Sequence, residues 1–467
     1  MKQTNCGIPV IKLSLFCGSI TQSCHKAFSA RFQNPINLNE SMNSSDTWRG
    51  HIFRLMSKVV YMDYNATTPL EAEVVQTITE ALQEAWGNPS STYPAGVKAK
   101  AMIKKSRESV ARLVGGEADD IIFTSGGTEA NNMVFHTAVE HFWRNWEAAQ
   151  ETHRHLNENR VFPHIVTSNV EHDSVKLAAE YLQENRKADV TFISVSQETA
   201  HVEVQDIIAA VRPNTCLISI MLANNETGVI MPIQEICSRV KAMNKKREKL
   251  RILLHTDAAQ ALGKIPVNAR ELGVDFLTIV GHKFYGPRIG ALYVNGPNTR
   301  TPLYPMLFGV KNAVQGLKYF WVSIISALLC FYQAAELVTN NLLDYEAHMQ
   351  KTRLYLEERL KAVFKDKIHF NSHYPGSDIL PNTCNVSILG PGLQGWRVLS
   401  NCTRLLASVG AACHSDSGDK PSDILLSCGI PVAVAANAVR LSLGRGTTKA
   451  DVDAVVEDLK ETVQLLC

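Results

Sequence analysis

Short apolar runs alternate with segments of helical periodicity through the middle of the chain. The apolar runs are rich in β-branched residues and lie near residues 121, 165, 190, 217, 252, 276 and 290. Because strands that alternate with helices form βαβ units, this pattern predicts an α/β fold with a mainly parallel sheet covered on both faces. A last amphipathic helix is expected from near Thr448, where Val452, Val455, Val456 and Leu459 recur at the helical spacing of core packing.

Two charged residues follow the ends of predicted strands. The run 252–254 leads to Asp257, and the run 276–280 leads to Lys283. Open α/β sheets bind ligands at the carboxyl ends of their strands. A lysine that forms a Schiff base and a carboxylate that keeps a pyridine nitrogen protonated are what a pyridoxal 5'-phosphate (PLP) enzyme needs. A helix cap at Asp257 and a solvated charge at Lys283 would also fit these positions.

A glycine pair follows the predicted strand at 121–124. Gly126, Gly127 and Thr128 stand between this strand and the helical pattern 130–142. Glycine lets the backbone approach an anion closely, and the free N–H groups at a helix start favour phosphate. An ordinary turn with a helix cap would give the same sequence. His282, beside the lysine, would add a donor to the same phosphate.

Two further loops follow strands and complete a predicted pocket. His172 offers an aromatic ring that would stack on a cofactor, although a single histidine is more often structural. Asn225, in the loop 223–228, has an amide suited to a phenolic oxygen or a carboxylate. Gln260, three residues after Asp257, would reach the same oxygen.

These motifs resemble the class V aminotransferase family, in the branch of cysteine desulfurases and selenocysteine lyases. The resemblance runs from about Val60 to Leu307 and again from about Ala334 to the C-terminus. Segments 171–174, 221–225 and 413–416 are most similar to the animal selenocysteine lyases. The motifs that carry the resemblance are residues 61–69, 87–91, 124–131, 171–172, 224–228, 255–260, 282–283, 408–413 and 439–444.

The resemblance implies a role for each cofactor-binding position. Lys283 would bind PLP covalently, Asp257 would face the pyridine nitrogen, and Gln260 the phenolate oxygen. His172 would stack on the ring. The phosphate would lie on Gly127, Thr128 and His282. Val280 stands where desulfurases usually carry a serine that contacts this phosphate.

Further positions concern the substrate. The resemblance assigns its carboxylate to Asn225 and Arg440, and a guanidinium matches a carboxylate with two hydrogen bonds. A surface arginine between helix and strand would be the ordinary interpretation of Arg440. Cys413, in a loop of small residues, would be the thiol that meets the departing selenium or sulfur. Asp173 is expected to discriminate selenium from sulfur, because it directly follows His172.

The implied fold is PLP fold type I. It has a large domain with a seven-stranded, mainly parallel sheet and a smaller α+β domain built from both chain ends. We expect an N-terminal extension at 1–57, the start of the small domain at 58–75, the large PLP-binding domain at 76–309 and the small C-terminal domain at 334–467. Residues 310–333 form an atypical segment between the last two.

The atypical segment replaces a family motif. The family has a Gly-rich, Arg-containing loop there, with a threonine that binds the cofactor phosphate of the partner subunit. This chain instead carries the apolar run 319–332. Since a membrane-spanning helix needs about twenty residues, this shorter run predicts a buried or partner-facing helix.

Composition agrees with a globular enzyme. The 467 residues are 45% hydrophobic and 20% charged, and the formal net charge of +2 gives no indication of nucleic-acid binding. The ten cysteines other than Cys413 form no C-x-x-C pair, so we expect reduced thiols and neither a disulfide framework nor a metal site.

No acidic residue precedes Glu40, and Lys2, Lys12 and Arg31 are basic. The extension would be a disordered leader or a mitochondrial transit peptide, and 8–20 faintly resembles a signal peptide.

The function implied by the resemblance is a PLP-dependent selenocysteine lyase. It would convert L-selenocysteine to L-alanine and release selenide to a reductant or selenium acceptor. One alternative is a cysteine desulfurase that takes L-cysteine and passes sulfur through a Cys413 persulfide. Another is a weakened isoform that acts as a non-catalytic dimer partner. We expect a cytosolic homodimer without nucleic-acid or membrane partners, or a mitochondrial one if the extension is a transit peptide.

Overall fold

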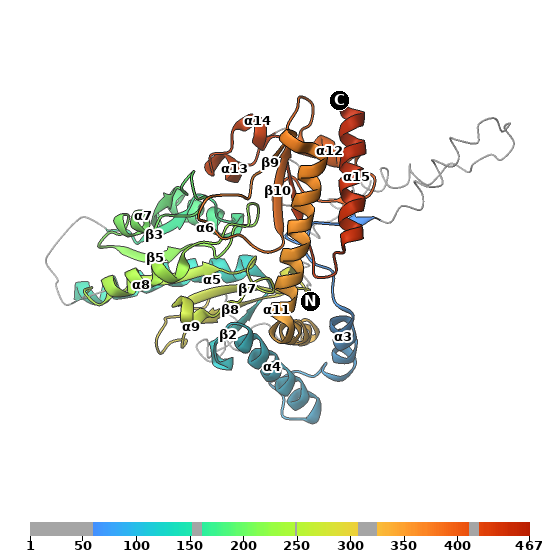
Figure 1. The fold of residues 1–467 in the computed structure, drawn as a ribbon. Coiled ribbons are helices and arrows are strands. Elements are labelled where there is room, and N and C mark those ends of the chain that lie inside the picture. The colour runs from blue at the N-terminus through green and yellow to red at the C-terminus, as the bar shows by residue number, and fades with distance from the viewer. Residues whose placement is uncertain (1–58, 152–160, 248–249, 307–324, 411–419) are drawn as a thin grey trace, which may run out of the picture. The chain divides into compact units, whose positions relative to one another are not determined.

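The computed structural model describes residues 59–151, 161–247, 250–306, 325–410 and 420–467. Their main feature is a seven-stranded sheet (Figure 1) with the order β2-β8-β7-β6-β5-β3-β4. Strand β8 is antiparallel to both of its neighbours, and the other neighbouring strands are parallel. The strands are β2 (Ile121–Thr124), β3 (His164–Ser168), β4 (Asp189–Ile193), β5 (Thr215–Ser219), β6 (Leu253–Asp257), β7 (Phe276–Val280) and β8 (Gly290–Val294).

Two smaller sheets lie in the C-terminal part of the chain, and one of them includes the region just after residue 58. Strand β1 (Val60–Tyr61) pairs in parallel with β11 (Leu405–Leu406). An antiparallel sheet has the order β12-β10-β9, with β9 at Ile368–Phe370, β10 at Thr383–Ile388 and β12 at Ala438–Ser442. Residues 58–467 form one compact unit.

Helices follow most strands of the large sheet. The α-helices in the described part of the chain are α3 (Ala72–Glu84), α4 (Pro94–Leu113), α5 (Gly127–Glu151), α6 (Asp173–Glu184), α7 (Val204–Ala209), α8 (Ile233–Asn244), α9 (Ala269–Leu272), α11 (Ile325–Phe364), α12 (Gly395–Asn401), α13 (Asp423–Ser427), α14 (Val432–Ala435) and α15 (Lys449–Leu466). The last helix begins where the sequence predicts, because Thr448 and Asp451 form a capping box at its start.

The two faces of the large sheet pack against different helices. Successive residues of a strand point to opposite faces. In β7, Leu277 and Ile279 belong to the cluster that contains buried residues of α4, α8 and α11. Phe276 belongs instead to the cluster built on α5 and α6. The sheet is therefore covered on both faces, which explains why its central strands are rich in buried apolar residues.

The described part of the atypical segment opens a long helix. α11 begins at Ile325 and continues to Phe364, so the described part of the apolar run belongs to a much longer helix. It packs on α3, α4 and α15 and runs beside α15 in Figure 1. Phe331 is fully buried, and its ring stacks on Phe284 with centroids 5.6 Å apart. A buried helix was one of the two expectations for this run.

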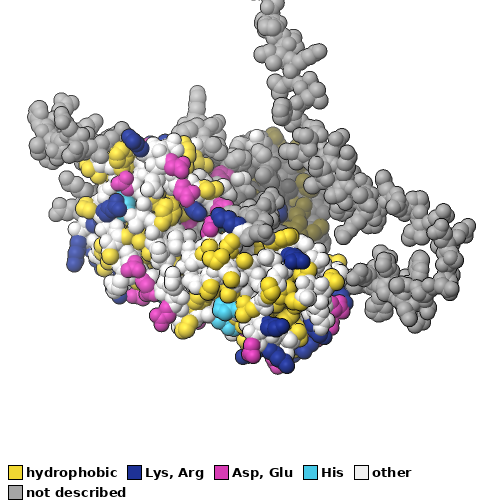
Figure 2. Space-filling model, turned by 90° about the horizontal axis from the view of Figure 1, so that it is seen from above, with side chains coloured by type: hydrophobic (Ala, Val, Ile, Leu, Met, Phe, Trp, Pro, Cys, Tyr) yellow, Lys and Arg dark blue, Asp and Glu magenta, His cyan; other side chains and the backbone are white. Residues whose placement is uncertain are grey.

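The surface carries charges of both signs. On the face in Figure 2, Lys and Arg side chains lie interspersed with Asp and Glu. Among the described residues, no helix is long and apolar enough to cross a membrane. The same residues contain no group of three or more His, Cys, Asp or Glu side chains placed to hold a metal ion.

Candidate active site

The carboxyl ends of β2, β3, β5, β6 and β7 meet at one edge of the large sheet, because these strands run in the same direction. A cavity of about 260 Å³ lies at this edge. It is lined by nine of the residues predicted from the sequence: Gly127, Thr128, His172, Asn225, Asp257, Gln260, His282, Lys283 and Arg440.

Two predicted residues are not in the described lining. Asp173, the first residue of α6, lines a neighbouring cavity of about 180 Å³ together with Gly410 and Lys420. Cys413 lies outside the described residues. Gly410 and Lys420 flank the segment 411–419 that contains Cys413, so Asp173 is close to the base of that segment.

Lys283 ends a short turn directly after β7. Its Nζ donates hydrogen bonds to the backbone oxygens of Asn65, at 2.7 Å, and Ala66, at 2.8 Å. Phe284 is buried beneath it against Phe331, and Tyr285 adopts a positive φ of 67°. A bulky residue in this region of φ is uncommon, and it fixes the direction of the chain just after the lysine.

Asp257, at the end of β6, is held by two donors. Asn131 Nδ2 donates to its Oδ2 at 2.9 Å, and the backbone N–H of Ala259 donates to its Oδ1 at 2.9 Å. Thr278 Oγ1 donates to Asn131 Oδ1, which leaves the amide nitrogen of Asn131 to face the carboxylate. Asp257 is only 8% exposed.

His172 caps the start of α6 and is oriented by the same network. The backbone N–H of Ser174 donates to His172 Nδ1 at 3.1 Å, so this nitrogen acts as an acceptor. Ser174 Oγ lies 2.9 Å from the same nitrogen and accepts from Asn131 Nδ2 at 2.8 Å. Asn131 thus links the predicted ring-stacking histidine to the predicted partner of the pyridine nitrogen.

The start of α5 also lines the cavity, through Gly127 and Thr128. The α-carbon of Gly127 lies so close to Val280 that an added Cβ would be 2.8 Å from its Cγ2. A side chain at this position would therefore force Val280 to shift. Burial is the main cause that lowers the pKa of His282 to about 4, and the charge of Lys283 adds to it. His282 is neutral at physiological pH, with Nδ1 3.1 Å from Thr67 Oγ1.

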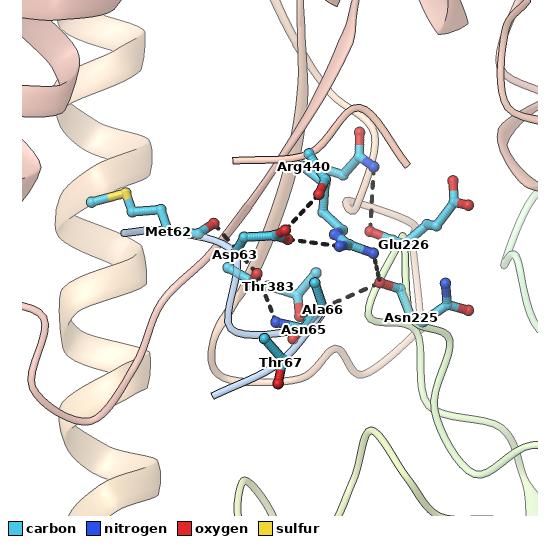
Figure 3. A network of polar contacts seen from close by, with 12 residues as sticks. Met62, Asp63, Asn65, Ala66, Thr67, Asn225, Glu226, Thr383 and Arg440 are labelled. Carbon is cyan, nitrogen blue, oxygen red and sulfur yellow. Dashed lines mark hydrogen bonds and ion pairs between the residues drawn. The ribbon is translucent and has the colours of Figure 1, made fainter. Parts of the chain in front are cut away.

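Arg440 joins β12 to the N-terminal motif (Figure 3). Its Nη2 forms an ion pair with Asp63 at 2.8 Å, and its Nη1 donates to the backbone oxygen of Asn225 at 3.0 Å. Ser408 donates to the other oxygen of Asp63. Among the residues that line the cavity, two have a buried side-chain atom with no partner in the described part of the chain, Arg440 at Nε and Asn225 at Oδ1. Unsatisfied buried polar atoms are rare, and two that belong to lining residues of one cavity are consistent with a polar ligand there.

Comparisons with known proteins agree with this geometry. The model of the family "Aminotransferase class-V" matches residues 60–455. The chain belongs to the class V aminotransferase family. It is 59% identical to selenocysteine lyase of Bos taurus over 417 residues, which are 88% of this chain and 94% of the bovine protein. It is 58% identical to the Homo sapiens selenocysteine lyase, covering 87% of this chain and 92% of the human protein.

More distant members of the class V family share the same fold. The cysteine desulfurase IscS of Dictyoglomus turgidum is 34% identical over 88% of this chain and 96% of its own length. A solved NifS-like protein superposes with a TM-score of 0.72 and 28% identity, covering 87% of this chain and all of that one. The structure of SspA in complex with cysteine gives a TM-score of 0.67. The predicted fold class, PLP fold type I, is confirmed.

The cavity of this class V chain fits PLP in its chemistry. Backbone N–H groups at the start of α5 and the neutral His282 suit a phosphate, and a bulkier residue than Gly127 would fill that end. A carboxylate held by two donors, Asp257, suits a protonated pyridine nitrogen. Lys283 supplies the amine. These groups lie around one cavity, as the cofactor requires.

Several residues of the site were not singled out from the sequence. Asn131 lies four residues after Gly127, so both are on one face of α5, and this spacing was an available signal. Asn65, whose backbone oxygen accepts from Lys283, gave no such signal because its partner is 218 positions away. Lys264 and Asp63 were missed for the same reason, since their partners are visible only in the fold.

Proposed function

We propose that this chain is a PLP-dependent selenocysteine lyase. It converts L-selenocysteine to L-alanine and selenide, and a reductant or selenium acceptor supplies the two electrons that the cleavage of the carbon–selenium bond requires. The observation that carries the proposal is that Lys283, Asp257 and Arg440 line one cavity in a chain similar to selenocysteine lyases over most of its length.

Bound PLP supplies an electron sink for the charge that develops at the substrate α-carbon. Asp257, held by Asn131, would face the ring nitrogen. Lys283 holds the cofactor and then moves the proton of the substrate α-carbon. Arg440 and Asn225 orient the substrate carboxylate, for which Arg440 Nε provides an N–H donor without a partner among the described residues.

We propose that the site prefers selenocysteine to cysteine, because a selenol is more acidic than a thiol and leaves more readily. A site that gives the leaving atom little assistance therefore penalises cysteine far more than selenocysteine. Asp173, in the neighbouring cavity, and Cys413 are proposed to act on this leaving atom. The alternative, a cysteine desulfurase, needs Cys413 as the persulfide carrier.

The test is turnover of L-selenocysteine and L-cysteine by the purified chain, followed by alanine formation. Lys283→Ala should lose covalent PLP, seen in its visible absorbance, and all alanine formation. The control is Lys187→Met, at an exposed lysine bonded to Tyr181. Equal rates on both amino acids, with the cysteine rate abolished in Cys413→Ser, would establish the desulfurase instead. Unchanged absorbance and rates in Lys283→Ala would overturn the assignment of the site.

A homodimer in the cytosol is part of the proposal. The homodimer is supported by the family resemblance, which implies that a partner subunit completes the phosphate site. A mitochondrial location remains the alternative if residues 1–57 act as a transit peptide. Light scattering of the purified chain and fractionation of cells that express it would test these two statements separately.

A further inference from the structure

Lys264 is a second lysine beside the cavity, and the proposed function gives it no role. It ends a turn that follows Gln260, and only 4% of its surface is exposed. Its Nζ donates to Gln260 Oε1 at 2.8 Å and to Asn65 Oδ1 at 3.0 Å. Among the described residues no carboxylate forms an ion pair with it. A buried amine bonded only to amide oxygens is costly, which favours a functional reason for it.

The first consequence concerns the amide of Gln260. Because Lys264 occupies the amide oxygen, the amide nitrogen must point the opposite way, and it now donates to the backbone oxygen of Asn65 at 3.0 Å. The oxygen and the nitrogen of a side-chain amide are similar in size and differ in hydrogen bonding, so without Lys264 the Gln260 amide could turn by 180° and exchange them. Gln260 would then present an acceptor to the cavity where a donor is needed.

The second consequence concerns Asn65. Its Oδ1 accepts from Lys264 and from Asn382, so its Nδ2 faces Thr383 at 2.9 Å and the backbone oxygen of Asn225 at 3.4 Å (Figure 3). Its own backbone oxygen accepts from Lys283. Lys264 therefore supports, through Asn65, both the amine that would bind PLP and the loop that contacts Arg440.

We propose that Lys264 is a positioning residue that fixes Gln260 with its N–H groups toward the phenolic oxygen of PLP and holds Asn65 beneath Lys283. The inference rests on the proposed function. Burial, reinforced by repulsion from Lys283 and Arg440, also lowers the pKa of the Lys264 ammonium well below its usual range. A neutral amine still has two N–H donors for its two amide oxygens.

The test is a pH titration of the visible absorbance of PLP bound to the purified chain, without any amino-acid substrate. Lys264→Met keeps an unbranched side chain, one atom shorter than lysine, and removes its donors. Once the phenolic oxygen loses a fixed donor it becomes more basic, so the pKa of the lysine–cofactor linkage should rise by about one unit. Lys187→Met is the control and should titrate as the unmodified chain does.

A second comparison separates positioning from a merely structural role. If Lys264 acts through Gln260, adding Lys264→Met to a Gln260→Ala chain should shift the pKa no further. An equal shift in both backgrounds, or no shift in Lys264→Met alone, overturns the inference. Lys264→Gln is measured in parallel, because its side chain is too short to make the hydrogen bond to Gln260 Oε1. If Lys264→Met does not fold, a titration of Lys264→Gln that equals that of the unmodified chain overturns the inference.

The titration also separates this inference from the proposed function. It needs only PLP, so a chain that binds PLP but does not turn over selenocysteine would still show the shift. Absence of the visible band from the unmodified chain would instead overturn the proposed function, and the inference with it.

Discussion

At the scale of single residues, the site is defined by how its polar groups are paired. Asp257 has both oxygens bonded, whereas Arg440 and Asn225 each retain a buried atom without a partner among the described residues. The scaffold thus fixes the Asp257 carboxylate completely, whereas Arg440 and Asn225 keep hydrogen-bonding capacity at the cavity. Asn131 orients Asp257 directly and His172 through Ser174.

Asn131→Ala should therefore lower turnover without unfolding the chain. It removes the only side-chain donor to Asp257 among the described residues and disconnects Ser174 from it. A hydrogen bond to a charged group contributes roughly 1.5 to 3 kcal/mol, so we expect a loss of about ten- to a hundredfold in kcat. Asn145→Ala, on an exposed part of the same helix, is the control. Identical kcat values for the two variants would show that Asn131 does not contribute to turnover.

Glu171 predicts a pH dependence of stability. Burial, only partly offset by hydrogen bonds from Ser168 and Met221, raises its pKa from 4.5 to about 8. Between these values the folded chain keeps the proton and the unfolded chain loses it. The free energy of unfolding therefore falls as pH rises through this range, by about 1.4 kcal/mol per pH unit at most.

Glu171→Gln should remove this loss, because glutamine cannot ionise. Denaturant unfolding at several pH values between about 5 and 8 should give a flatter profile than that of the unmodified chain. Exposed Glu198→Gln should leave the profile unchanged. Parallel profiles for the unmodified chain and Glu171→Gln would show that Glu171 is ionised in the fold.

At the scale of elements, α11 connects the atypical segment to the site. Its Phe331 packs on Phe284, the residue after Lys283, and also approaches Phe123 of β2. The first turns of this helix thus support the strand end that carries the lysine. The C-terminal half of the same helix packs in a different cluster, with β10, β12 and α15.

Phe331→Ala should reduce both stability and PLP retention. Truncation of a fully buried phenylalanine lowers the free energy of unfolding by about 3 to 5 kcal/mol. The void that it leaves would lie against Phe284, the residue after Lys283. Leu356→Ala is the matched control, because Leu356 is equally buried on the same helix but belongs to the other cluster. We expect loss of stability in both variants and faster loss of PLP on dialysis only in Phe331→Ala. Equal retention would show that α11 does not support the site.

At the scale of the whole molecule, the family resemblance predicts that residues 310–333 replace a loop that would reach the partner's cofactor phosphate. Most of this segment lies outside the described residues. The site also has Val280 where the family serine would contact phosphate. Each charge-assisted hydrogen bond contributes roughly 1.5 to 3 kcal/mol, so two lost contacts would weaken PLP binding by about a hundredfold or more.

The expected result is weaker PLP retention and lower turnover than in the bovine relative, which is 59% identical. Dialysis followed by PLP quantification measures retention, and light scattering measures the dimer. Grafting the family's Gly-rich loop into 310–333 should restore retention. Full retention before the graft, with unchanged turnover after it, would show that the replacement is harmless.

The strands and the positions of the main site residues were predictable from the sequence, for a local reason. Apolar periodicity depends on neighbouring residues only, and all seven predicted runs became strands of the large sheet. The motifs around Asp257 and Lys283 follow parallel strands, whose carboxyl ends share an edge, so their meeting was predictable too. The long α11 was not, because its first turns carry an apolar run with no sign of a continuous helix.

Which groups pair with one another was decided only by the tertiary structure. Arg440 bonds Asp63 across 377 positions, and Lys264 bonds Asn65 across 199. A buried polar group must find a partner within hydrogen-bonding distance, and that partner is whichever group the packing brings near it. Sequence alone therefore determined which chemical groups this protein has and at which edge of the sheet they gather. Their orientation, and the two lysines at one cavity, depend on contacts between distant segments that no local pattern encodes.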